Sequence, residues 1–205
     1  MTNPHQGTGM NIVIRTAGDR TIVRPDTTWE KNSDDFFPPD FVDLVSWSPV
    51  MFARVSKPGR SVGPQFARRY YDSIGFGLLL YPENLIDGSS EGYATASCLD
   101  HTSYLPVPLF NLATAASADN RFTVRKDGRE LFSISPGDPS RGSVIGISLI
   151  ERLIVETTRM VYIRKGDFVA AELCPRKKLL SRDEPPARIT ASFCDNTVLD
   201  FEIRY

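Results

Sequence analysis

The chain has 205 residues, of which 41% are hydrophobic and 24% are charged. This length suits a single domain, and the composition is that of a globular protein rather than a disordered one. Lysine plus arginine (24) nearly equals aspartate plus glutamate (25), so charge gives no reason to expect a nucleic acid or an anionic membrane as a partner. No apolar run approaches the roughly 20 residues of a membrane-spanning helix, and the polar start of the chain does not form a secretory signal.

We expect residues 1–10 to form a disordered tail and residues 11–205 to form one domain. The three cysteines, Cys98, Cys174 and Cys194, are widely spaced and odd in number. This usage predicts neither a zinc site nor a disulfide framework, so a reducing cytoplasm is the expected location.

The first half of the chain is predicted to contain short strands and one helix. The helix is expected over residues 64–74, because Pro64 suits an early helical position and the apolar side chains Phe66, Tyr70 and Ile74 recur every four residues. Apolar runs bounded by turn-forming residues predict the strands. These runs are residues 11–15, 20–23, 51–55 and 75–81.

The second half carries the clearest local signals. Residues 122–125 and 130–132 flank Asp127-Gly128, and Asp-Gly is a preferred turn between two paired strands. A second helix is predicted over residues 148–160, with an apolar stripe at helical spacing. Further strands are expected over residues 168–173, 189–193 and 198–203. The predicted fold class is mixed β with two helices (α+β).

The order of these elements, together with several short strings, resembles the fumarylacetoacetate hydrolase family. The strings are residues 37–41, 54–60, 66–72, 165–167 and 199–201. The resemblance runs from about residue 11 to the C-terminus and implies a β-sandwich roll, usually a homodimer. Family members hydrolyse, decarboxylate or tautomerise oxo acids with a divalent cation such as Mg²⁺, which polarises a substrate carbonyl as a Lewis acid.

The same resemblance assigns the family's functional positions to residues of this chain. Two metal-binding glutamates, two residues apart on one strand, fall on Ser48 and Val50. A third ligand, an aspartate, falls on Leu79, and a catalytic lysine falls on Ser97. An aspartate three residues after that lysine is retained as Asp100.

These replacements predict that the site binds no metal and needs no cofactor. A hard dication needs oxygen donors, mainly carboxylates, and no Asp or Glu occurs over residues 44–51 or 73–82, so a shift of register does not restore the site. Apolar side chains there would remove the repulsion between clustered carboxylates, roughly 4 kcal/mol per pair at 4 Å and an effective dielectric of 20. Trp47 and Phe52 flank the positions and are expected to plug the former cleft.

Three residues are weak candidates for a rearranged site: Asp100, His101 and Glu172. Cys98, Asp100 and His101 are close in sequence, but a nucleophile and its base normally come from distant segments, so structural roles are the simpler interpretation. Asp100 is expected to accept a hydrogen bond that stabilises its loop. Glu172 lies near the family's substrate turn, which is Cys174-Pro175 in this chain.

The basic residues Arg54, Lys57, Arg60, Arg68 and Arg69 are interpreted as a solvated face, with the nearby aromatic side chains pointing inward.

The leading hypothesis is a dimeric pseudoenzyme with a structural role, a role as partner of an active paralogue, or a role in binding a small oxo acid. The alternative is a metal-independent hydrolase, isomerase or decarboxylase that acts on an oxo acid through Asp100, His101 and Glu172. A third hypothesis is an unrelated all-β binding module. Fold alone does not choose among them.

Overall fold

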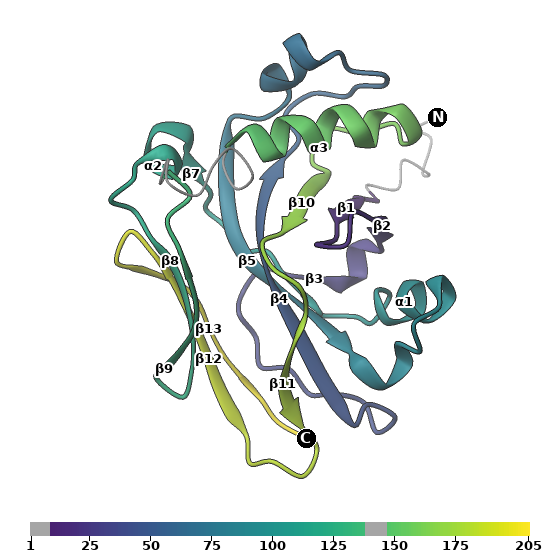
Figure 1. Cartoon of the computed structure of the whole chain (residues 1–205), viewed down its shortest axis with the longest axis vertical. Coiled ribbons are helices and arrows are strands. Elements are labelled where there is room, and N and C mark those ends of the chain that lie inside the picture. The colour runs from purple at the N-terminus through teal and green to yellow at the C-terminus, as the bar shows by residue number, and fades with distance from the viewer. Residues whose placement is uncertain (1–8, 138–146) are drawn as a thin grey trace, which may run out of the picture.

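The computed structural model describes residues 9–137 and 147–205, so most of the predicted tail lies outside the described residues. Within them the strands form two sheets (Figure 1). The nine-stranded sheet holds β1 (Ile12–Arg15), β2 (Thr21–Arg24), β3 (Trp29–Glu30), β4 (Leu44–Arg54), β5 (Ser73–Pro82), β6 (Ser103–Tyr104), β7 (Phe110–Asn111), β10 (Phe168–Glu172) and β11 (Lys177–Ser181). The four-stranded sheet holds β8 (Phe122–Lys126), β9 (Arg129–Ile134), β12 (Ala187–Phe193) and β13 (Asn196–Ile203).

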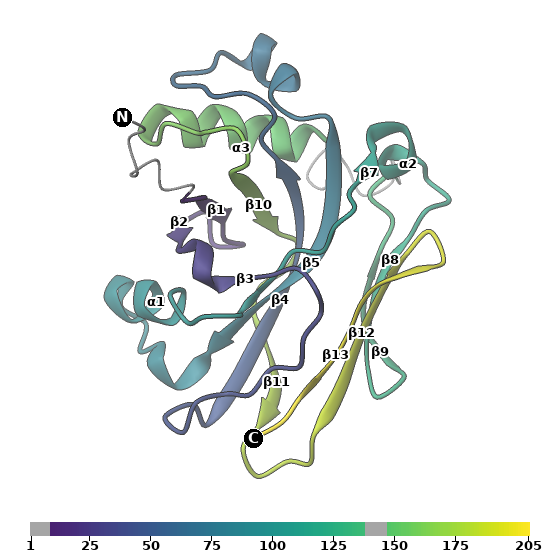
Figure 2. The same ribbon diagram turned by 180° about the vertical axis from the view of Figure 1, so that it is seen from behind.

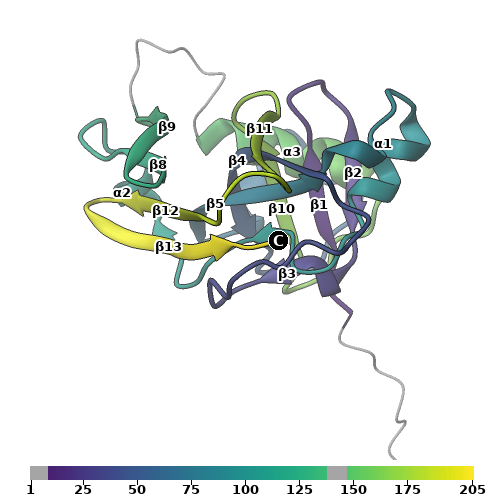
Figure 3. The same cartoon turned by 90° about the horizontal axis from the view of Figure 1, so that it is seen from below.

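The larger sheet curls into a roll, with strand order β2-β1-β10-β4-β5-β6-β3 (Figure 3). Its curvature follows from contacts between strands that are not neighbours. Trp29 on β3, at one end of the order, packs edge-on against Phe168 on β10 with ring centroids 5.1 Å apart. Arg24 on β2, at the other end, donates a hydrogen bond to the Leu80 carbonyl on β5. These contacts bring both ends of the strand order onto the inner face of the sheet.

Two hydrophobic cores lie on the two faces of β4. Successive side chains of a strand point to opposite faces, so Trp47 and Met51 enter the core between the two sheets, whereas Val50 and Phe52 enter the roll. Helix α3 (Ile147–Met160) packs against β10 and β4 and contributes its apolar stripe to the core between the sheets. Figure 2 shows the smaller sheet standing beside the roll.

The predicted fold class is confirmed, and so are helix α3, the hairpin around Asp127-Gly128 and the two C-terminal strands β12 and β13. The first predicted helix is wrong. Residues Pro64–Tyr70 form a 3-10 helix, and Ser73–Pro82 belong to β5, because pairing with β4 and β7 draws the end of the segment into the sheet.

Short helices also occur where none was predicted. They are α1 (Ser90–Ala96), α2 (Leu112–Ala116) and the 3-10 turns Asp26–Thr28 and Glu83–Leu85. Helix α1 begins after Ser89, whose side chain accepts a hydrogen bond from the Gly92 amide, and it lies beside the roll. Among the residues that the structure describes, no helix is long and apolar enough to cross a membrane.

Candidate functional site

The three positions assigned to metal ligands converge inside the roll. Ser48 on β4 lies directly opposite Leu79 on β5, and Val50 follows two residues later on the same face of β4. All three residues are fully buried. The resemblance selected them from two separate segments, and the structure brings them together on one face of the sheet.

The chemistry at these positions does not fit a divalent cation. Val50 and Leu79 carry no donor atom and belong to the apolar core of the roll. The Ser48 hydroxyl is neutral and donates a hydrogen bond to the Cys174 carbonyl at 2.7 Å. Within residues 9–137 and 147–205, no three His, Cys, Asp or Glu side chains form a group that could hold a metal ion.

The packing around these positions is a continuous apolar cluster. It is formed by Ile12, Ile14, Val50, Phe52, Leu79, Tyr81, Tyr93, Leu105, Phe168 and Ala170. The prediction that Phe52 fills this space is therefore confirmed. The prediction for Trp47 is wrong, because that side chain points to the opposite face of β4 and packs between the sheets.

Glu172 is the sequence-predicted candidate that reaches this region. It lies opposite Val50 on the neighbouring strand β10, so both side chains share one face. Its carboxylate accepts hydrogen bonds from the Tyr81 hydroxyl at 2.6 Å and from the Ala17 amide at 2.9 Å. Burial raises the pKa of Tyr81 well above its ordinary value, and Arg24 opposes that rise. Tyr81 is therefore a hydrogen-bond donor held against a carboxylate.

Arg24 is the feature of the site that the sequence reasoning missed. Its side chain is fully buried, and its guanidinium lies 4.3 Å from the centroid of the Tyr81 ring. It donates to the carbonyls of Leu80 and Thr102 and to the hydroxyls of Thr102 and Ser103 at 3.0 to 3.2 Å. Arginine stays protonated, so the roll carries its own fixed positive charge, with Tyr81 between that charge and Glu172.

A hollow of about 500 Å³ opens beside Glu172 and is called here the Glu172 pocket. Arg20, Tyr93 and Arg176 are among its lining residues. The Arg176 guanidinium bonds the Glu83 carboxylate at 2.9 Å and lies 4.9 Å from the Tyr93 ring centroid. The pocket therefore combines a carboxylate, two arginines and an aromatic wall.

Asp100 and His101 do not join Glu172. The His101 side chain is 67% exposed, and its Nδ1 lies 3.2 Å from the carboxylate of Glu30 on β3, whereas Glu172 on β10 is held by Tyr81 and Ala17. Asp100 is exposed, and its carboxylate accepts no hydrogen bond from any described residue, so the stabilising role expected for it is not observed. Cys98 is also exposed. Ser97, at the lysine position, is buried and donates to the Tyr93 carbonyl at 2.8 Å.

The basic residues that were interpreted as a solvated face are exposed, as predicted. They are Arg54, Lys57, Arg60, Arg68 and Arg69. The prediction that the aromatic side chains point inward holds for Tyr71, which is buried, but is wrong for Phe66, which is 43% exposed. Phe66 stays outside because the 3-10 turn buries Ala67 instead.

Comparison with known proteins supports the fold. No protein-family model and no curated protein matches the sequence. Solved structures do match. A Yersinia pestis CO92 protein assigned to the fumarylacetoacetate hydrolase family superposes with a TM-score of 0.76 at 14% identity, covering 95% of this chain and 92% of the other.

Two further structures carry different activities on the same fold. The fumarylpyruvate hydrolase of Pseudomonas aeruginosa, in complex with Mn²⁺ and pyruvate, has a TM-score of 0.74 at 12% identity and covers 96% and 89% of the two chains. The 2-hydroxyhepta-2,4-diene-1,7-dioate isomerase of Mycobacterium marinum has a TM-score of 0.75 at 11% identity and covers 95% and 74%.

This chain therefore has the fold of the fumarylacetoacetate hydrolase family, which removes the hypothesis of an unrelated all-β module. The residues at the positions assigned to metal ligands are a serine and two hydrocarbons. Hydrolases and isomerases share the fold, so function has to be argued from the site itself.

Proposed function

We propose that this chain is a non-catalytic protein built on the fumarylacetoacetate hydrolase fold. The observation that carries the proposal is the burial of Ser48, Val50 and Leu79, the last two within a packed apolar cluster, where the resemblance places three carboxylates. Burying each of the two hydrocarbon side chains favours folding by roughly 1.5–3 kcal/mol, whereas unpaired carboxylates there would be destabilising. The substitutions turn a charged cleft into hydrophobic core.

The pocket that remains supports a binding role for a small oxo acid. Arg20 supplies positive charge for a carboxylate, Arg176 adds a guanidinium that it shares with Glu83, and the Tyr93 ring supplies an apolar wall. The Pseudomonas aeruginosa structure, which holds pyruvate together with Mn²⁺, supports this class of ligand. The proposal also includes a homodimer or a complex with an active paralogue, and a cytoplasmic location.

The rival function is a metal-independent hydrolase, isomerase or decarboxylase. One observation favours it, because Glu172 borders the pocket while its carboxylate is oriented by the Tyr81 hydroxyl at 2.6 Å. A carboxylate held in this way is placed to accept a proton from a bound oxo acid as a general base. Asp100 and His101 contribute nothing to this arrangement, since they lie away from it.

Thermal unfolding with and without ligands tests the proposal. Millimolar Mg²⁺ or Mn²⁺ should leave the melting temperature unchanged. Pyruvate or oxaloacetate at about a hundredfold over Kd should stabilise the fold by about 2.7 kcal/mol. The Arg20→Gln variant should lose that shift, and the matched exposed variant Arg60→Gln should keep it. A saturable shift with either cation would contradict the proposal.

Turnover measurements separate the rival. If the rival is correct, conversion of an acylpyruvate or of oxaloacetate survives EDTA, disappears in Glu172→Gln and persists in His101→Ala. Absence of turnover together with retained oxo-acid binding supports the non-catalytic role. Light scattering in solution tests the homodimer separately.

A further inference from the structure

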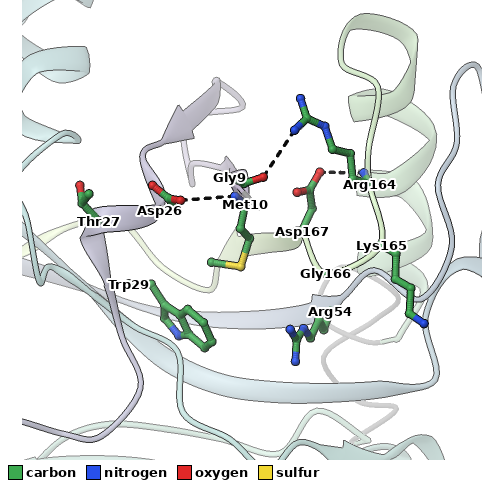
Figure 4. A pocket seen from close by; sticks show the side chains of 10 residues that line it. All are labelled: Gly9, Met10, Asp26, Thr27, Trp29, Arg54, Arg164, Lys165, Gly166 and Asp167. Atoms are coloured by element: carbon green, nitrogen blue, oxygen red, sulfur yellow. Dashed lines mark hydrogen bonds between the residues drawn. The ribbon is translucent and has the colours of Figure 1, made fainter. Parts of the chain in front are cut away.

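A second hollow, of about 680 Å³, opens at the other end of β4 and is called here the Trp29 pocket (Figure 4). Figure 4 shows Trp29 on one side, Arg54 and Lys165 on the other, and Met10 between them. Its volume lies within the roughly 300–1,000 Å³ typical of ligand pockets. Neither the proposed function nor the positions assigned to metal ligands use any of these residues.

The two pockets are separate places on the roll. Val50 lies opposite Glu172, and Arg54 lies four residues further along the same strand, opposite Phe168. At about 3.3 Å per residue, this places Arg54, at the edge of the Trp29 pocket, roughly 13 Å from Val50 along the strand. The further inference is therefore independent of the proposed oxo-acid site.

Trp29 gives the pocket a rigid aromatic wall. Its indole N–H donates to the Leu105 carbonyl at 2.9 Å, and its ring packs edge-on against Phe168 at 66°. These two contacts fix the ring plane, yet the side chain remains only half-buried and borders the hollow. A fixed, partly open indole presents a stacking surface at little cost in conformational entropy.

The charges around the wall favour an anion. Arg54, Arg164 and Lys165 line the hollow, and within the described residues none of their side chains forms an ion pair. The Asp167 carboxylate also lines the hollow, where it is buried and accepts hydrogen bonds from the Asn11 amide at 2.9 Å and the Arg164 amide at 2.8 Å, so it offsets part of this positive charge.

One further carboxylate, that of Asp26, lines the hollow. Asp26 is exposed, and its carboxylate accepts a long 3.5 Å hydrogen bond from the Met10 amide. The Lys31 ammonium, at 6.0 Å from the Trp29 ring centroid, adds a further cation near the aromatic wall. Positive charge therefore exceeds negative charge where the hollow meets solvent.

We propose that the Trp29 pocket binds a small aromatic anion, a carboxylate or a phosphate ester. The ring stacks on Trp29 and Met10, and the anionic group lies between Arg54 and Lys165. Both contributions are needed, since an exposed arginine alone holds an anion weakly in water.

Titration calorimetry on the full chain tests this inference with 1-naphthoate and phenyl phosphate as probes. The neutral 1-naphthamide tests the aromatic part alone, and acetate tests the charge alone. At least one aromatic anion should bind, at least tenfold more tightly than naphthamide or acetate. Binding should weaken as NaCl is raised, because the charged groups are open to solvent.

Variants locate the binding. Arg54→Gln and Lys165→Gln change exposed side chains and should each weaken binding at least fivefold. The matched variant Arg60→Gln and the Glu172-pocket variant Arg20→Gln should change it less than twofold. No binding of either anion at about 5 mM, equal binding of naphthamide, or equal effects of Arg54→Gln and Arg60→Gln would overturn the inference.

Discussion

Substitution of Leu79 by aspartate would return a carboxylate to a position that the resemblance assigns to a metal ligand. In this chain Leu79 is fully buried, lies opposite Ser48 and packs in the apolar cluster of the roll. We therefore expect Leu79→Asp to destabilise the protein and not to create a metal site.

The size of the effect follows from two contributions. Truncating a buried leucine costs about 2–5 kcal/mol, as Leu79→Ala would show. A carboxylate in the same place must either stay ionised without a partner or take up a proton, and a raised pKa costs about 1.4 kcal/mol per unit. Leu79→Asp should therefore be at least about 1–3 kcal/mol less stable than Leu79→Ala at neutral pH. The total free energy of unfolding of a typical domain is only about 5–15 kcal/mol.

Urea unfolding from pH 4 to pH 8 measures this, with Leu79→Asn as the uncharged control. Burial raises the pKa of the new carboxyl in the folded state, so the folded state binds the proton more tightly than the unfolded state. The free energy of unfolding of Leu79→Asp is lower than that of Leu79→Asn at neutral pH, and this difference should therefore shrink as pH falls through the raised pKa. If Leu79→Asp matches Leu79→Ala at pH 7, or gains stability from millimolar Mg²⁺, the reasoning is refuted.

Three further substitutions test other parts of the account. Tyr81→Phe removes a charge-assisted hydrogen bond to Glu172 and should cost about 1–2 kcal/mol in urea unfolding, with water from the pocket limiting the loss; no loss would show that this bond is not stabilising. Arg24→Leu leaves buried carbonyls and hydroxyls without their donor and should cost more than about 3 kcal/mol, whereas an unchanged midpoint would contradict its role in closing the roll. The pKa of Glu184 is lowered to about 2, chiefly by its hydrogen bond from Lys178. The ionised Glu184 therefore stabilises the folded state fully above the unfolded pKa of about 4.3, and this stabilisation is lost as pH falls towards 2. The wild-type advantage over Glu184→Gln should disappear over that interval, and a constant difference would argue against the ion pair.

Strong local patterns account for the parts of the fold that were predictable. The Asp127-Gly128 turn and the apolar stripe of α3 are short-range signals, and the structure contains both elements. Helices α1 and α2, of seven and five residues, are too short to show a helical period. The helix predicted at Pro64 was wrong for another reason, since its first part forms a 3-10 helix and its last residues, Ser73 and Ile74, pair with the distant strands β4 and β7.

In the candidate site, too, some residues could be located from the sequence and others could not. Ser48, Val50 and Leu79 were found through ordered similarity, and strand alternation places the first two on one face. The same alternation could have excluded Trp47 from the cleft, because it is adjacent to Ser48. Arg24 had no comparable signal, since the backbone and side-chain acceptors that hold it lie 56 to 79 residues away.

Titration calorimetry with Mn²⁺ on the unmodified chain measures whether the positions of Ser48, Val50 and Leu79 bind a cation. An apolar cluster at Ser48, Val50 and Leu79 predicts no saturable heat up to about 1 mM Mn²⁺. One Mn²⁺ bound per chain in the micromolar range, and lost in Ser48→Ala, would contradict it.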